Sequence, residues 1–283
     1  MPHSHKPQEN WFFTQDGTDF LPAKGALGYW LPGTLNGSAV ASLLALVLEQ
    51  RHGEPGLVPV RFSVDLLGMA RAEPLQVDSH VIKSGGRLRL AEATIHQNGT
   101  LIARASIQFL RETHAPTNPT WQSPAWGAPH PDMLAASKRR GSWELRPIPA
   151  DHARVDRTLS VAADPAHGNP PVLGALSPLE NRQTWLFVDR RIVAGVAHTP
   201  FTRLALAGDF ASPLAHSSEA GIDYVNSDFT IYAHRMPVGE WLGFEHVGHS
   251  ATRGVAIGEC WVHDLDGPVA TINVSALAQL KRG

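Results

Sequence analysis

Asp209 is the residue of this sequence best placed to act as an acid or a base. It lies in the segment PFTRLALAGDFA, where Leu204, Leu206 and Phe210 make most of the predicted helix apolar. Burial among apolar groups disfavours the charged form of a carboxylate and raises its pKa. A carboxylate tuned in this way can take a proton from a water molecule as that water attacks a carbonyl carbon.

Asn226 is the polar side chain that we expect to assist Asp209. It begins the strand-like pattern NSDFTIYA, and its amide can hold the attacking water in line. A backbone N–H from a helix start or a glycine turn can then bind the developing oxyanion. The alternative is structural: Asp209 only bonds a neighbouring backbone group at the end of its helix.

Other catalytic chemistries lack their residues. Cys260 is the single cysteine, and His246 and His249 have no third partner in sequence, so we expect no metal. There is no Gly-x-Ser-x-Gly nucleophile motif, no phosphate-binding loop and no dinucleotide fingerprint. We expect no cofactor, because water is the second substrate.

Two parts of the sequence, Val60 to Leu110 and Ser227 to Leu277, show the same order of patterns. Each begins with an alternating apolar strand and ends with a hairpin before a last strand, and the hairpin turns are Asn98-Gly99 and Asp266-Gly267. A repeat of this length is evidence about the fold.

A predicted helix precedes each repeat, over Leu35 to Glu49 and over Pro200 to Ala211. Asn36 and Thr199 are suited to cap the two helices. The first helix is apolar on nearly every side, which predicts that a sheet wraps round it. The pattern predicts an α+β chain with the double hot-dog fold: two hot-dog units, each an antiparallel sheet wrapped round a long helix.

We expect an N-terminal hot-dog over residues 1–113, a linker over 114–149 and a C-terminal hot-dog over 150–283 that carries the active site. The proline-rich linker is expected to pack through Trp121 and Trp126. Two units in one chain already form a pseudo-dimer, and a homo-oligomer is compatible with this arrangement.

Charge and hydropathy exclude several classes of partner. The formal net charge is -2, so the sequence lacks the excess of positive charge that is typical of proteins that bind nucleic acid. The apolar run Ala41 to Leu48 is far shorter than the ~20 residues that span a bilayer. The N-terminal residues MPHSHKPQEN contain no apolar signal core, so we expect a cytoplasmic protein with no membrane partner.

Four segments carry a resemblance to a known family. They are the approach Trp30-Leu31-Pro32-Gly33, the helix LAGDFASPL, the block VNSDFTIYAHRMPVGEWL and the hairpin GECWVHDLDGPVA. The block from His234 to Trp241 is the most specific of them. Over most of its length the chain resembles the acyl-CoA thioesterase II family, which implies a double hot-dog fold and hydrolysis of acyl-CoA by an activated water.

The resemblance also implies three polar side chains in the C-terminal unit. Asp209 matches the family's helix aspartate, and Asn226 matches a hydroxyl or amide position on the following strand. The third position, a glutamine in the family, falls at about Val274, which cannot orient water. A shift of one residue brings Asn273 or Ser275 there instead. Strand register decides which of these residues faces Asp209. We take Ser275 as the third catalytic candidate.

The block from His234 to Trp241 supplies further candidates. His234 and Trp241 are expected to line a channel for the acyl or pantetheine part of the substrate, with core packing as the alternative. Arg235 and Glu240 flank a turn, and we expect them to form an ion pair across it.

Two other functions compete with thioester hydrolysis. Gly208-Asp209, Pro213-Leu214 and His216 are similar to the motif of hot-dog enoyl-CoA hydratases, with the histidine two residues too late. A non-catalytic acyl-CoA or lipid-binding protein is the second alternative, and Val274 favours it. Release of thiol indicates a thioesterase, loss of enoyl absorbance a hydratase, and binding alone an acyl-binding protein.

Overall fold

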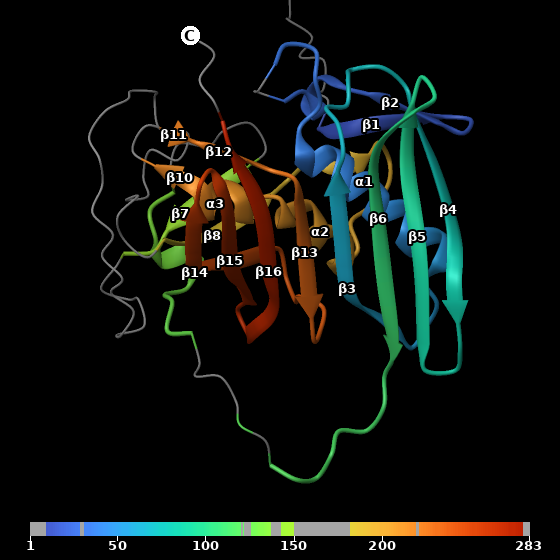
Figure 1. Ribbon diagram of the computed structural model, residues 1–283. Helices are drawn as coiled ribbons and strands as arrows, with labels where there is room; N and C mark the ends of the chain where they lie inside the picture. Colours follow the sequence, from blue (N-terminus) through green and yellow to red (C-terminus); the bar gives the residue numbers. More distant parts are fainter. Residues whose placement is uncertain are drawn as a thin grey trace, which may run out of the picture.

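A single large sheet with helices on one of its faces organises the chain (Figure 1). This computed structural model describes residues 10–28, 31–119, 121, 126–136, 143–149, 182–218 and 221–279. Within them the strands follow the order β7-β8-β14-β15-β16-β13-β3-β6-β5-β4-β2-β1-β9, with β12 beside β16. Neighbouring strands are antiparallel except for β1 and β9, so the architecture is α+β, as predicted.

The N-terminal half contributes one helix and most of its own strands. Its elements are β1 (Trp11–Asp16), β2 (Asp19–Pro22), the 3-10 helix η1 (Lys24–Ala26), α1 (Gly37–His52), β3 (Leu57–Leu66), β4 (Leu75–Ser84), β5 (Leu88–Gln97) and β6 (Thr100–Arg111). The connecting region contains the 3-10 helix η2 (Pro131–Met133) and β7 (Trp143–Pro147).

The second half repeats the arrangement with a broken helix. Its elements are β8 (Gln183–Val188), β9 (Arg191–Val193), α2 (Pro200–Gly208), α3 (Ala211–His216), β10 (Ser217–Ser218), β11 (Gly221–Ile222), β12 (Tyr224–Asn226), β13 (Asp228–Ala233), β14 (Trp241–Thr252), β15 (Val255–Asp264) and β16 (Gly267–Ala278). β10 and β11 form a separate small ladder.

The local signals in the sequence account for where the helices and hairpins begin. The Asn36 side chain accepts a hydrogen bond from the backbone N–H of Ala39 at 2.6 Å and caps α1. Thr199 caps α2 through a reciprocal bond with Thr202. Asn98 has a φ of 51°, so the first hairpin turns through the left-handed region that Asn and Gly favour. The predicted caps and this turn are confirmed.

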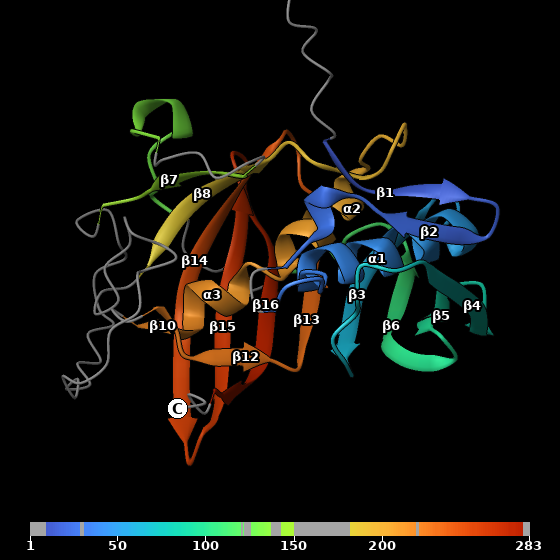
Figure 2. The same cartoon turned by 90° about the horizontal axis from the view of Figure 1, so that it is seen from above.

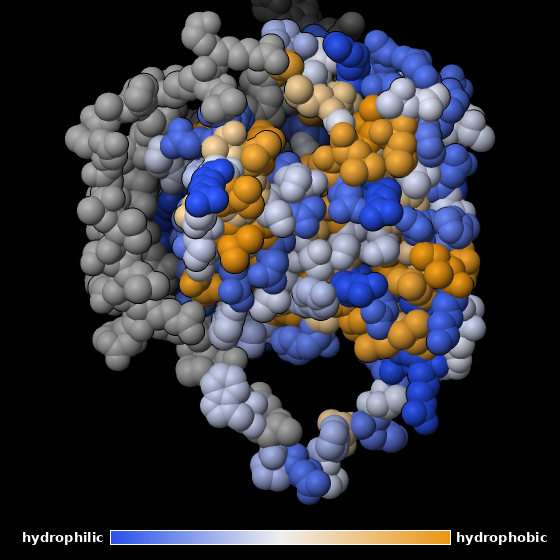
Figure 3. All heavy atoms as spheres, viewed as in Figure 1, coloured by the Kyte–Doolittle hydropathy of each residue, from blue (hydrophilic) through white to orange (hydrophobic). Residues whose placement is uncertain are grey.

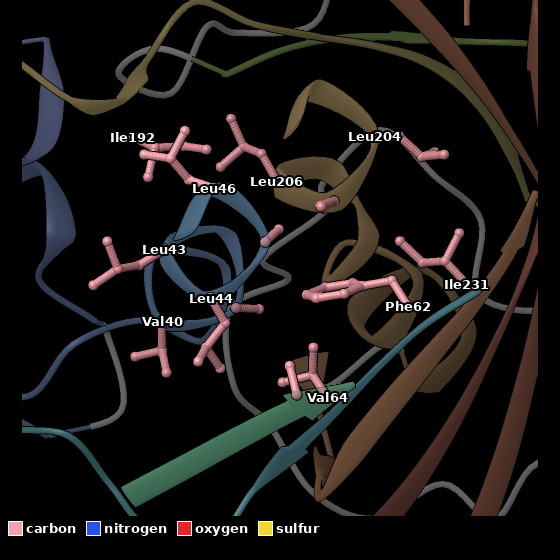
Figure 4. Close-up of a cluster of buried hydrophobic side chains, with 14 of the residues drawn as sticks. Val40, Leu43, Leu44, Leu46, Phe62, Val64, Ile192, Leu204, Leu206 and Ile231 are labelled. Atoms are coloured by element: carbon pink, nitrogen blue, oxygen red, sulfur yellow. The ribbon is translucent and has the colours of Figure 1, made fainter. Parts of the chain in front are cut away.

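α1 lies at the centre of the core. Every residue from Ser38 to Leu48 is buried, and Ser42 satisfies its hydroxyl by donating to the carbonyl of Ala39 at 3.2 Å. Figure 2 shows α1, α2 and α3 on the same side of the sheet, and Figure 4 shows α1 side chains beside residues of α2, β3, β9 and β13. A helix that is apolar on all sides has no other stable place in a folded chain.

The sheet's other face is open to solvent. Figure 3 shows polar and apolar side chains interspersed across it. Tyr232, Ile257 and Leu277 are among its exposed large side chains. Within the described residues, no helix has the length and apolar character needed to cross a bilayer.

The predicted linker is partly integrated into the fold. Trp126 stacks on His263 with ring centroids 4.3 Å apart, and its Nε1–H donates to Gln183 Oε1 at 2.7 Å. The prediction for Trp121 is wrong, because that side chain is 82% exposed. Its neighbours 120 and 122–125, and the approach residue Trp30, lie outside the described residues.

The junction between the halves generates a stability prediction. The Phe62 ring on β3 lies 5.6 Å from that of Phe201 and 6.2 Å from that of Phe229, both from the second half. Phe62→Ala should lower the free energy of unfolding by about 3–5 kcal/mol, because it leaves a cavity where the halves meet. Urea denaturation followed by circular dichroism measures this loss. Tyr232→Ala, on the exposed face of the same junction, should change stability by less than about 0.5 kcal/mol.

Candidate active site

Asp209 is the C-cap residue of α2, and its carboxylate lies against the first turn of α1. Oδ2 accepts a hydrogen bond from Ser38 Oγ at 3.1 Å, and the backbone N–H of Ser38 also donates to the carboxylate. Oδ1 accepts from Asn226 Nδ2 at 2.9 Å. The start of α1, which is 171 positions away in sequence, and the end of β12 therefore converge on this carboxylate.

Gly37 allows this close approach. A Cβ built on Gly37 would lie 2.9 Å from both carboxylate oxygens of Asp209, closer than carbon and oxygen tolerate. The absence of a side chain thus lets the carboxylate reach the start of α1. The positive end of the helix dipole and its unpaired N–H groups stabilise negative charge at this place.

Burial and hydrogen bonding shift the pKa of Asp209 in opposite directions. Asp209 is half-buried, yet protein atoms surround its carboxylate densely, and this desolvation raises its pKa above the usual 3.8. The bonds from Asn226 and Ser38 lower the pKa by a smaller amount. The carboxylate is therefore a stronger base than an exposed aspartate, as the apolar helix pattern predicts.

β12 and β16 position Asn226. Asn226 pairs with Ala276 of β16, and its side chain points to the helix side of the sheet, where it meets Asp209. Val274 and Ala276 are both buried on that face of β16. The alternation of side chains along a strand explains this placement.

Ser275 and Asn273 are not brought to Asp209. They alternate with buried Val274 and Ala276, so their side chains lie on the other face of β16. The main chain of Ser275 accepts a bond from the N–H of Ser227 and donates one to Asp228 Oδ1. Of the three candidates Asn273, Val274 and Ser275, only Val274 lies on the helix side of β16, and Ser38 is the hydroxyl that contacts the carboxylate.

Sequence reasoning missed Ser38. In sequence it is one of few polar residues on an apolar helix, and nothing nearby indicates that it faces a residue 171 positions later. The sequence marks only the place: the segment Asn36-Gly37-Ser38 begins a helix with small residues, and helix starts bind anions, but this pattern does not identify Asp209 as the partner.

His234 and Trp241 lie away from Asp209. Asn226 pairs with Ala276 of β16, whereas Ala233, the neighbour of His234, pairs with Ala270. At the rise of a β-strand, these two positions on β16 are roughly 20 Å apart, and so are Asn226 and His234. His234 is exposed. Trp241 packs beside Phe187 and under the guanidinium of Arg146, which is 4.6 Å from the ring centre.

The expected ion pair between Arg235 and Glu240 is wrong. Arg235 instead binds both carboxylate oxygens of Asp264, at 2.5 and 2.6 Å, and the backbone N–H of Val238 also donates to Asp264. Glu240 faces Arg203 at 3.5 Å. Arg235 pairs with Asp264 and not with Glu240 because Asp264 is buried at the neighbouring hairpin, where a bidentate bond to arginine is strong.

His216, the histidine of the hydratase-like motif, does not contact Asp209. Its Nδ1 lies 3.1 Å from Nδ1 of His249, and its ring is near Tyr224. Within the described residues no group of three or more His, Cys, Asp or Glu side chains is arranged to hold a metal ion. The geometry therefore gives the hydratase motif no acid–base pair.

Comparison with known families decides the class of protein. Residues 27–110 match the model of the acyl-CoA thioesterase N-terminal domain, and residues 127–277 match that of the C-terminal domain. The chain belongs to the acyl-CoA thioesterase family. It is therefore a thioester hydrolase.

Solved structures share the fold of this thioesterase at low identity. A protein assigned as a thioesterase II from Thermobifida fusca YX has a TM-score of 0.67 and 15% identity, with 96% of each chain covered. The acyl-CoA thioesterase II TesB2 of Mycobacterium marinum has a TM-score of 0.60 and 17% identity, covering 91% of this chain and 97% of its own.

A protein of unknown function with a hot-dog fold from Alicyclobacillus acidocaldarius has a TM-score of 0.64 and 16% identity, with 95% and 96% covered. At such identities these likenesses show the fold alone, and that fold is the hot-dog. A comparison with curated protein sequences gives no match.

Two histidines in the second half of this thioesterase, His216 and His246, have lowered pKa values. Burial lowers the pKa of His216 to about 4, with the charge of His249 adding to the effect, and burial next to Arg182 lowers that of His246 to about 4. A histidine with a lowered pKa stabilises the fold fully above its ordinary pKa of 6.5, and this stability is lost as pH falls from 6.5 to about 4.

We therefore expect the free energy of unfolding to decrease as pH falls through this window. Between pH 6.5 and 4, the free energy of unfolding of His216→Gln should fall by about 3 kcal/mol less than that of the native chain. The reason is that unfolding of the variant takes up one proton fewer. Denaturant titrations at a series of pH values measure both slopes. Exposed His80→Gln is the matched control, and parallel slopes for all three proteins would contradict the prediction.

Proposed function

We propose that the chain hydrolyses acyl-CoA with a water molecule that Asp209 activates as a general base. The observation that carries this proposal is the convergence of Ser38, Asn226 and the start of α1 on the Asp209 carboxylate. Because the chain belongs to the acyl-CoA thioesterase family, the bond that is broken is the thioester C–S bond of acyl-CoA. The raised pKa of Asp209 supports its part as the base.

The reaction proceeds by addition and elimination. Asp209 takes a proton from water as the water oxygen attacks the thioester carbonyl carbon, and the carbonyl electrons move to the oxygen. The oxyanion then collapses, the C–S bond breaks, and the thiolate of CoA receives the proton that Asp209 holds. The products are the free acid and CoA, and Asp209 returns to its charged form.

Asn226 and Ser38 divide the task of orientation. The amide of Asn226 has a second N–H and a carbonyl oxygen, which are suited to fix the attacking water beside Oδ1. Ser38 holds Oδ2 and so fixes the rotation of the carboxylate. In this proposal Ser38, from the N-terminal half, supplies a polar group to the site, because the β16 residue at the family's glutamine position is the apolar, buried Val274.

The arrangement of the halves supports a double hot-dog. The pairing of β3 with β13 sets Phe62 opposite Ile231 and Val64 opposite Phe229, so the two repeats meet in a self-complementary way. Each half wraps strands round a helix, and α1 and α2 pack against one another. We propose that these halves are two hot-dog units with one catalytic site between them.

Replacement of Asp209 tests the proposed base directly. Asp209→Asn should lower kcat/KM for thiol release from acyl-CoA by at least about 100-fold, because general base catalysis contributes that much. A thiol reagent follows the reaction over short, long and aromatic acyl chains. Asp78→Asn, which changes an exposed carboxylate, should leave kcat/KM unchanged, and equal activity of both variants would refute the mechanism.

Removal of the Ser38 hydroxyl should move the pH profile. Ser38 lowers the pKa of Asp209, so Ser38→Ala should raise this pKa and shift the acid limb of kcat/KM to higher pH. The maximal rate should fall by roughly tenfold, the equivalent of one weak hydrogen bond. Ser42→Ala, one turn later on α1 and bonded only to its own helix, is the control. Identical acid limbs for the two variants would exclude Ser38 from the site.

A further inference from the structure

A pocket of about 400 Å³ opens at the other end of the paired helices, away from Asp209. Its apolar wall is formed by Leu57, Pro59 and Phe109. Its polar wall contains Glu49 and Gln50 from α1 and Thr199 from the start of α2. The volume of the pocket lies in the lower part of the range of ligand-binding clefts, roughly 300–1,000 Å³, and the pocket opens widely to solvent.

The register of the sheet identifies this pocket as the counterpart of the Asp209 site. Pro59 precedes Phe62 by the same interval as Asn226 precedes Phe229, and the pairing of β3 with β13 makes the two phenylalanines equivalent. Pro59 pairs with Phe109 of β6 as Asn226 pairs with Ala276 of β16. The pocket therefore occupies, in the N-terminal half, the place that the candidate active site occupies in the C-terminal half.

A carboxylate lies at each of these places. Asp209 ends α2 and meets the start of α1, while Glu49 lies near the end of α1 and meets the start of α2. Thr199 Oγ1 donates to Glu49 Oε2 at 2.6 Å, and among the described residues no group donates to Oε1. Glu49 thus offers one acceptor oxygen to a ligand. Burial raises the pKa of Glu49, and the bond from Thr199 opposes this effect.

The groups that would orient a water are replaced in the counterpart. Pro59 stands where Asn226 stands and has no amide side chain. The first two residues after the cap of α2 are Pro200 and Phe201, whereas those of α1 are Gly37 and Ser38. The pocket retains a carboxylate and a cavity and lacks the partners that would direct an attack on a carbonyl carbon.

Two arginines next to the pocket form ion pairs with its lining residue Glu54, while Glu49 inside the pocket is a second carboxylate. Glu54 is bound by Arg89 at 2.5 Å and by Arg111 at 2.7 Å, so two cations surround one anion. The two guanidinium groups are suited to phosphate groups outside the pocket, and the wall of Leu57, Pro59 and Phe109 is suited to an apolar part inside it. A thioester of CoA has both, together with amide N–H groups that can donate to Glu49.

We propose that this pocket is a second site of the chain, which binds acyl-CoA and does not hydrolyse it. The inference rests on the proposed function, because the symmetry of the halves assigns the pocket a ligand of the class that the Asp209 site takes. Glu49 accepts a hydrogen bond from the pantetheine arm, and the acyl group lies against Leu57, Pro59 and Phe109. Arg89 and Arg111 face the phosphates.

Counting bound ligands tests the proposal. The probe is octyl-CoA, a thioether that cannot be hydrolysed, titrated by calorimetry into the native chain and into Asp209→Asn. We expect two molecules bound per chain in each protein. Gln50→Trp places a large ring in the pocket from an exposed position, and it should reduce the count to one while thiol release continues.

Two further variants make the outcome decisive. Gln76→Trp is the matched control, because Gln76 is exposed on β4 and lines neither site; its count should stay at two. Glu49→Leu should weaken the second binding event at least tenfold and leave kcat unchanged, which provides a second measurement if the tryptophan disturbs folding.

Two results would overturn the second site. The native chain binds one octyl-CoA and Gln50→Trp also binds one, or the native chain binds two and Gln50→Trp still binds two. Neither outcome touches the proposed function, which depends on the loss of thiol release in Asp209→Asn.

Discussion

The backbone pairing of β3 with β13 is the constraint on which the rest of the structure depends. It joins the sheets of the two halves, and the contact of α1 with α2 follows from it, because each helix is held to the sheet of its own half. The start of each helix is thereby placed at the end of the other. The carboxylate of Asp209 meets Gly37 and Ser38 only because this junction exists.

The junction explains why the candidate site belongs to neither half alone. Asp209 and Asn226 come from the second half, while Ser38 and the N-terminus of α1 come from the first. A buried carboxylate without donors would be costly, and those donors come from both halves. The close contact at Gly37 shows how tightly the two parts fit.

Local signals in the sequence predicted the elements well. Asn36 and Thr199 are chemically suited to cap helices, and Asn98-Gly99 is suited to a tight hairpin, so each could be assigned from a few neighbouring residues. The contact of Asp209 with Asn226 was also within reach, since an apolar helix and a polar strand start indicated both residues.

Contacts set by packing could not be predicted in this way. Arg235 was expected to bind Glu240, its neighbour in sequence, but the hairpin brings the buried Asp264 closer. Ser275 depended on a register that shifts by one residue with any error in alignment, and such a shift exchanges the two faces of the strand. Ser38 required knowledge of how α1 and α2 cross, which periodicity does not contain.

The parallel pairing of β1 with β9 links the fold to the order in which the chain is made. β9, which belongs to the second half by sequence, completes the edge of the first half's sheet. A ribosome exposes β1 long before it has made Arg191 to Val193, so the nascent first half carries an open strand edge during that time. Open edges promote association between chains. The first half alone should therefore be prone to association during synthesis until β9 covers the β1 edge and β13 covers the β3 edge.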